Sequence, residues 1–149
     1  MKGKKFNLTS LSSGGKQLIP ILLESNYLFI TDFEELRKFK WTMLIRQPEL
    51  HLHPKIQADL AEFFLRISKG PYCRAIIIET HSEHMIRKFQ ILIAKGQLDK
   101  DSISIYYLDG KLIKEMEFEE NGFFKEPWPE GFFDSSYNLA RELIYARKN

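Results

Sequence analysis

Apolar residues along the chain fall into short continuous runs and into stretches with helical spacing. The runs Trp41–Ile45 and Ala75–Ile78 are typical of strands buried on both faces of a sheet. Between them, helical spacing predicts a helix that begins near Pro54, a residue suited to the first helical position, and stops at Gly70. Strand, helix and strand in this order predict two parallel strands. The apolar residues of the helix are Leu60, Phe64 and Ile67.

The segment before the first strand predicts another helix. Ser12 or Ser13 can cap its start, and the pattern runs to about Tyr27. Pro20 lies inside the pattern, where it removes one backbone hydrogen bond and should kink the helix. Residues 31–40 are charged and predict a surface connection or a short helix. The apolar residues on the buried side of the first helix are Leu18, Ile19, Leu22 and Leu23.

A further helix follows the second strand. Thr80 and Glu83 have the spacing of a capping box at its start, and Gly96 marks its end. Alternating strands and helices predict an α/β fold in which both parallel strands end at one edge of the sheet. Ligands of open α/β sheets bind at that edge, so the residues after each strand are candidates for chemistry. The apolar residues of this helix are Met85, Phe89 and Leu92.

The last third of the chain has a different pattern. Ser102–Leu108 and Leu112–Phe118 flank Asp109-Gly110, a dipeptide typical of a tight turn, and therefore predict a β-hairpin. Asp134 or Ser135 then caps a final helix. One face of this helix carries Leu139, Leu143 and Ile144.

Composition changes this picture little. Hydrophobic residues make up 44% and charged residues 28% of the 149 positions, as in ordinary globular domains. The net charge of +2 is too small to indicate a nucleic-acid partner by itself. Cys73 is the only cysteine, so no intrachain disulfide can form and a reducing cytoplasm is expected. The most apolar stretch, residues 18–30, is too short to span a bilayer, so no membrane association is expected.

Three short strings carry the candidate chemistry, and the last two contain all four histidines. Residues 11–17 read Leu-Ser-Ser-Gly-Gly-Lys-Gln, residues 44–54 read Leu-Ile-Arg-Gln-Pro-Glu-Leu-His-Leu-His-Pro, and residues 79–84 read Glu-Thr-His-Ser-Glu-His. In this order they resemble the C-terminal half of the SMC- or ABC-like predicted ATPases of the AAA family. Residues 128–134, Trp-Pro-Glu-Gly-Phe-Phe-Asp, resemble a C-terminal extension found in one branch of that family.

The resemblance implies a partial P-loop NTPase fold of the ABC-like type. It covers about residues 8–137. Residues 1–101 are then expected to form the C-terminal lobe of the ATPase domain, and residues 102–149 the hairpin and extension packed on the same domain.

The resemblance also implies site residues. Ser12, Ser13 and Gly14 match the signature that opens a helix, whose serine and backbone N–H groups contact the γ-phosphate of a nucleotide held by the opposite protomer. A helix start with small residues suits an anion physically. His81 matches the switch histidine, which senses the γ-phosphate and the attacking water.

The middle string matches the Walker B strand and the loop after it. Arg46 stands where the family carries its magnesium-binding acid, and arginine has no acceptor for a cation or its water. Arg46 is expected instead to form a structural ion pair, and the alternative is a direct contact with phosphate. Gln47 stands at the position that orients the attacking water, but it cannot take a proton. Glu49 and His51 match further nucleotide-facing positions of this loop. The site is therefore a degenerate Walker B site in which Gln47 and His81 are the candidate catalytic residues.

No stretch of the chain has the glycine, lysine and serine or threonine spacing of a P-loop. ATP and Mg²⁺ are therefore expected only with a completing partner, either a P-loop-bearing subunit or the family's N-terminal half, which these residues lack. The expected protein partners are such an ATPase subunit or further copies of the chain. No cofactor and no metal are expected for the chain alone. DNA binding is expected only by analogy with the family.

These observations predict a partial or degenerate ATPase domain, inactive alone, that acts as a nucleotide-responsive or assembly module. One alternative is a metal-dependent hydrolase, because His51 with His53 and His81 with His84 offer four imidazoles. The other is an assembly subunit without a ligand. The support for this alternative is a cluster of aromatic residues in a loop-rich segment, which would mark a partner surface if it were exposed. The cluster consists of Phe123, Phe124, Trp128, Phe132 and Phe133.

Overall fold

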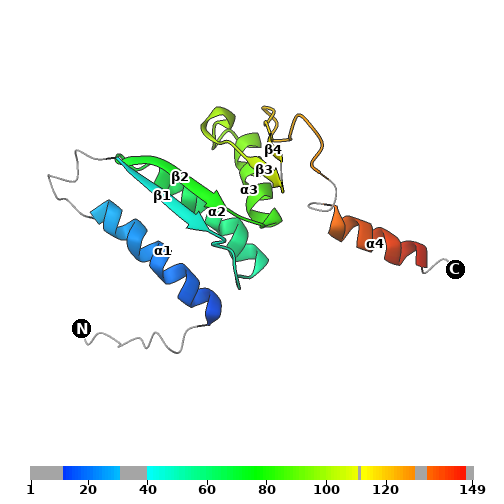
Figure 1. Cartoon of the computed structure of the whole chain (residues 1–149), viewed down its shortest axis with the longest axis horizontal. Coiled ribbons are helices and arrows are strands. Elements are labelled where there is room, and N and C mark those ends of the chain that lie inside the picture. The colour runs from blue at the N-terminus through cyan, green and yellow to red at the C-terminus, as the bar shows by residue number, and fades with distance from the viewer. Residues whose placement is uncertain (1–11, 31–39, 111, 130–133, 147–149) are drawn as a thin grey trace. The chain divides into compact units, whose positions relative to one another are not determined.

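The computed structural model describes residues 12–30, 40–110, 112–129 and 134–146 (Figure 1). The chain divides into two compact units, Met1–Met85 and Ile86–Asn149. This division falls earlier than the expected domain boundary at residues 101 and 102, which stays a prediction. In chain order the helices and strands are α1 (Ser13–Ile30), β1 (Trp41–Arg46), α2 (Pro54–Ser68), β2 (Cys73–Glu79), α3 (Glu83–Ala94), a 3₁₀ turn (Lys100–Ser102), β3 (Tyr106–Asp109), β4 (Leu112–Glu115) and α4 (Ser135–Ala146).

The first unit is built on a parallel pair of strands, as the sequence predicts. β1 and β2 run side by side, and Arg46 at the end of β1 is the register partner of Glu79 at the end of β2. The connection between them is α2, which packs on β2 and buries one apolar stripe. Pro54 occupies its first turn, as expected. The buried residues of α2 are Leu60, Ala61, Phe64 and Ile67.

The sheet has one covered face and one open face. Met43 on the covered face is 7% exposed, whereas Leu44 next to it is 75% exposed and its register partner Ile77 is 57% exposed. The prediction that these strands are buried on both faces is therefore wrong for the described residues. A continuous apolar run is typical of strands covered on both faces, but it does not say what covers each face.

α1 begins where the sequence places it. Ser12 is the cap, because its hydroxyl oxygen accepts a hydrogen bond from the Gly15 N–H at 3.2 Å. Pro20 lies inside the helix as expected. The predicted connection over residues 31–40 lies outside the described residues except for Lys40.

The start of α3 differs from the expected capping box. Ser82 caps the helix, since its Oγ accepts from the Met85 N–H at 3.1 Å. The Thr80 hydroxyl instead accepts from the Ser82 N–H at 3.0 Å and forms a tight turn before the helix. The Thr80–Glu83 assignment is therefore wrong by two residues, because each of the two hydroxyls can serve a nearby N–H. Gly96, with φ of 66°, ends the helix as predicted.

The second unit contains the predicted hairpin. β3 and β4 pair antiparallel, with Asp109 opposite Leu112, and are shorter than the sequence pattern. The segment after β4 covers one side of the hairpin through a chain of aromatic contacts. Phe118 stacks on Phe124 at 4.6 Å between ring centroids, and Trp128 contacts both Phe124 and Tyr107.

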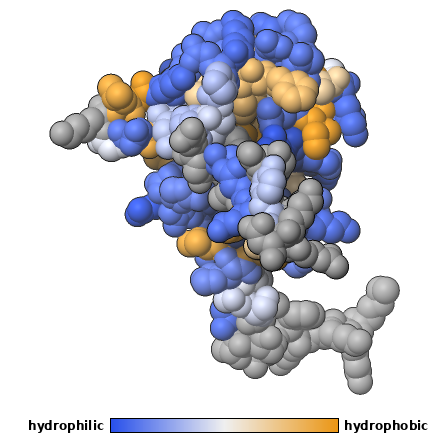
Figure 2. All heavy atoms as spheres, turned by 90° about the vertical axis from the view of Figure 1, so that its right-hand side faces the viewer, coloured by the Kyte–Doolittle hydropathy of each residue, from blue (hydrophilic) through white to orange (hydrophobic). Residues whose placement is uncertain are grey.

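Several large apolar side chains of the second unit are exposed. In Figure 2, orange patches between the blue hydrophilic atoms show hydrophobic residues at the surface of the molecule. Leu108 is 70% and its register partner Ile113 is 73% exposed on the hairpin. Leu139 and Leu143, one turn apart on α4, are 66% and 72% exposed.

Among the helices that the structure describes, none combines the length and apolar content needed to cross a membrane.

Candidate functional site

The ends of the two parallel strands bring together the residues that the sequence singles out. Arg46 Nε donates to Glu79 Oε1 at 3.1 Å across the open face of the sheet. Both side chains are well exposed, at 79% and 53%. The position expected to carry an acid therefore holds a cation that is already paired with a carboxylate from the neighbouring strand. An exposed pair of this kind contributes little to stability, so its effect is on the local charge of the site.

Gln47 continues the strand pairing by one residue and then turns the chain. Its N–H donates to the Glu79 carbonyl at 2.7 Å, and its φ of 47° lies in the left-handed region. Its own carbonyl accepts from the Gln17 side-chain amide of α1 at 3.1 Å. The backbone of Gln47 is thus held on two sides, where the strand edge meets α1.

Glu49 and His81 join the loop after β1 to the loop after β2. Glu49 is only 7% exposed, and its Oε1 accepts from the His81 N–H at 2.7 Å. The His81 side chain itself is exposed. The structure thus gives Glu49 a protein partner, and its predicted contact with a nucleotide stays a prediction.

A second contact between these loops runs through Ser82. Its Oγ donates to Gln57 Oε1 at 2.7 Å, and the Gln57 amide donates to the Leu52 carbonyl at 2.9 Å. Ser82 is 4% exposed, so this link is shielded from water. The residues around His81 are therefore fastened both to the loop after β1 and to α2.

The start of α1 lies against the same loop. A Cβ added at Gly14 would meet the His51 carbonyl oxygen and Leu52 Cδ2, each at 2.7 Å. Only glycine therefore permits this close approach, while Ser13 at the first helical position is exposed. His51 takes the left-handed conformation, with φ of 61°. The contact brings the predicted signature residues to the loop that follows the predicted Walker B strand.

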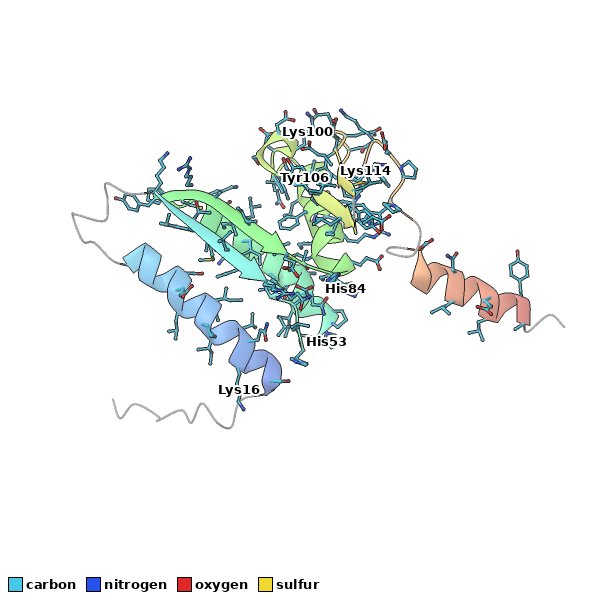
Figure 3. The ribbon with its side chains drawn as sticks, in the orientation of Figure 1. Lys16, His53, His84, Lys100, Tyr106 and Lys114 are labelled. Atoms are coloured by element: carbon cyan, nitrogen blue, oxygen red, sulfur yellow. The ribbon has the colours of Figure 1, made fainter. Side chains whose placement is uncertain are left out.

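The histidines do not form a metal site among the described residues, where no group of three or more potential ligands occurs. His53 caps α2, with its Nδ1 accepting from the Lys55 N–H at 3.3 Å. Figure 3 shows His53 at the start of α2 and His84 at the start of α3. Burial raises the pKa of the Cys73 thiol, and Cys73 begins β2 at the end away from these loops. The metal-hydrolase alternative therefore gains no geometric support.

The contacts of three residues of the site were not found from the sequence. Gln17, Gln57 and the role of Glu79 as partner of Arg46 emerge only from the structure. Glu79 had one usable signal, because two charged residues of opposite sign end the two predicted strands. Gln17 ends the string 11–17 that carries candidate chemistry, but nothing in that string indicates its partner. Gln57 had no signal, since a polar residue on a helix is usually solvated.

The fold and the site define a class of protein: a mixed α/β chain with a small parallel sheet and an antiparallel hairpin, consistent with a partial P-loop NTPase-like fold. A family model described as AAA ATPase domain matches residues 2–86, more than half of the chain. The chain therefore belongs to the AAA ATPase domain family. No curated protein and no solved structure matched the chain.

Proposed function

We propose that the first unit is the signature and Walker B part of an SMC- or ABC-like ATPase site, inactive by itself, which responds to nucleotide once a P-loop is supplied. The P-loop would come from another chain or from a further segment of the same protein. Support comes from three observations together: the family match over residues 2–86, the meeting of the predicted motifs at one sheet edge, and the absence of a P-loop pattern from these 149 residues.

The observation that carries the proposed inactivity of the site is the ion pair between Arg46 and Glu79. A magnesium ion that bridges phosphates needs oxygen ligands or ordered water at the end of this strand. The guanidinium of Arg46 offers donors only and would repel a nearby cation. Gln47 can orient a water molecule but is a poor base. The site is therefore expected to sense or bind nucleotide without rapid hydrolysis.

The first test is phosphate release from ATP and Mg²⁺ by the purified chain. We expect no activity above contamination level. Activity that survives further purification and falls in His81→Ala would contradict the proposal, because the chain alone would then be a working ATPase.

The second test supplies a P-loop-bearing half, in cis or as a second chain. We expect Arg46→Asp to introduce magnesium-dependent nucleotide binding, while hydrolysis stays slow because Gln47 is unchanged. Arg46→Asn is the matched control, since it removes the cation without adding an acid. If a correctly folded complex with Arg46→Asp shows no magnesium dependence, the Walker B assignment of β1 is wrong.

An assembly role is supported by a separate observation, the open face of the sheet. Leu44 and Ile77 are register partners and both are largely exposed. Exposed apolar faces and strand edges favour association. We expect the purified chain to self-associate at micromolar concentration or to require a partner. Sedimentation would decide, and a stable monomer over that range would count against it.

A further inference from the structure

A buried carboxylate connects two loops that are far apart in sequence. Glu49 follows β1, and its Oε1 accepts from the backbone N–H of His81, which follows β2. At 2.7 Å this is a short contact, and a hydrogen bond to an ionised acceptor is roughly twice as strong as one between neutral groups. The contact constrains the backbone of His81 and leaves the imidazole exposed.

The other carboxylate oxygen, Oε2, is buried and has no hydrogen-bond partner among the described residues. Burying an acceptor without a donor is unfavourable, and such groups in folded proteins occur where another role requires them. A residue that served packing alone would fill this space better without a charge. The carboxylate is thus present at the expense of stability, and within the described part of the chain its hydrogen bond is with the His81 N–H.

The hydrogen bonds of Ser82, the residue after His81, show which backbone group depends on Glu49. Ser82 is already fixed by Gln57 and caps α3, so the start of the helix does not depend on Glu49. The residue that Glu49 holds in addition is His81. Its carboxylate therefore holds the backbone of the second residue after β2.

We propose that Glu49 is a positioning residue, which holds the His81 backbone so that the imidazole projects from the strand edge. Glu49 then acts on a bound nucleotide only through His81 and is not itself a nucleotide ligand. The role of Glu49 toward a nucleotide rests on the proposed function of the site, but its contact with His81 can be tested without any nucleotide.

The test uses the full chain labelled with ¹⁵N and follows the backbone amide and the imidazole of His81. In Glu49→Leu and in Glu49→Asp, where the carboxylate is withdrawn by one methylene, we expect the His81 amide to move upfield. Its protection against hydrogen exchange should fall about tenfold or more, as for loss of a charged hydrogen bond. The imidazole signals of His81 should shift as well, whereas those of His53 and His84 stay. Glu49→Gln keeps an acceptor and should retain most of the protection.

Glu24→Gln is the matched control, an exposed glutamate of α1 that should move no His81 signal. If Glu49→Leu does not fold, Glu49→Asp decides. The proposal is overturned if the Asp variant leaves the amide and imidazole of His81 unchanged, or if all four histidines shift alike, as a general loss of structure would produce. A negative result counts against Glu49 alone, whereas failure of the completed complex to bind nucleotide counts against the proposed function.

Discussion

The loops at the strand ends of the first unit and the hairpin of the second unit are held by different interactions. In the first unit, side chains bond to backbone groups of a neighbouring loop, as Glu49 does with His81 and Gln17 with Gln47. In the second, aromatic rings and exposed ion pairs join the segment after β4 to the hairpin, with Tyr107 against Trp128 and Lys114 paired with Glu126 at 2.5 Å. One side-chain to backbone bond, from the Gln90 amide to the Gly122 carbonyl, holds this segment to α3.

This difference in interactions suggests that the first unit carries the candidate site and that the second unit mainly provides packing. Hydrogen bonds between loops fix atoms in particular positions, as a binding or catalytic site requires. Aromatic contacts and exposed ion pairs hold surfaces together but fix atoms less tightly. The family match ends at residue 86, where the second compact unit begins, so the two descriptions divide the chain at almost the same place. The AAA ATPase character therefore resides in the first unit.

The largest effect is expected from Gly122→Ala, which should destabilise the second unit and leave the first unit folded. Its φ is 81°, and an added Cβ would lie 2.1 Å from the Gln90 carbonyl oxygen on α3. Gly122→Ala should lower the free energy of unfolding by about 3 kcal/mol, from backbone strain and a clash that cannot relax cheaply. Urea denaturation followed by tryptophan fluorescence measures the loss.

Gly110→Ala is the matched control, because Gly110 also has a positive φ, of 50°, but nothing lies within 4 Å of its added Cβ. It should cost about 1 kcal/mol from strain alone. Equal losses in the two variants would show that the contact between Gly122 and α3 does not hold the second unit.

A smaller effect is expected at Gly14, where α1 meets the loop after β1. In an open helix, alanine in place of glycine adds about 1 kcal/mol of stability. Here the Cβ would meet the His51 carbonyl oxygen at 2.7 Å, so Gly14→Ala should instead destabilise the first unit by about 1–2 kcal/mol. Lys16→Ala, at an exposed position of the same helical turn, is the control. A gain in thermal stability of Gly14→Ala would mean that α1 does not rest on this loop.

A change of less than about 1 kcal/mol is expected from Arg46→Asp in the chain alone. The introduced carboxylate would face Glu79 across the two strands, and like charges opposite each other are destabilising. Because paired carboxylates bind hard cations, millimolar Mg²⁺ or Mn²⁺ should raise the melting temperature of Arg46→Asp back to that of the unmodified chain. Arg46→Asn should show neither the loss nor the recovery. An identical metal response in both variants would show that the introduced carboxylate does not form such a site with Glu79.

The smallest effect concerns pH and belongs to the second unit. The hydrogen bond from Lys114 lowers the pKa of Glu126 from its ordinary value of 4.5. A carboxyl group with a lowered pKa in the folded state stabilises above its unfolded pKa, and the contribution is lost as pH falls through the folded pKa. A carboxyl ¹³C titration should therefore give a Glu126 midpoint below 4.5 that returns to the ordinary value in Lys114→Met. Because the pair is exposed, the change in stability should be slight.

Much of the fold could be predicted from local pattern. Helix α2 begins at Pro54 and its stripe of Leu60, Phe64 and Ile67 is buried, because periodicity and a fixed φ act within a few residues. The hairpin turn at Asp109-Gly110 follows for the same reason. The parallel pairing of β1 and β2 follows from the helix that connects them. The family match was likewise anticipated in its coarse form, from strings of residues at fixed spacing.

What the sequence alone determined is thus the set of elements, their order and the edge at which the candidate residues gather. Only the tertiary structure decided which side chains meet there: that Arg46 pairs with Glu79, that Glu49 holds His81, and that Ser82 rather than Thr80 caps α3. It also decided that Leu44 and Ile77 face outward. The physical reason is range. Helix and turn preferences depend on neighbours along the chain, whereas hydrogen bonds between loops and the cover of a sheet face depend on residues brought close only by folding.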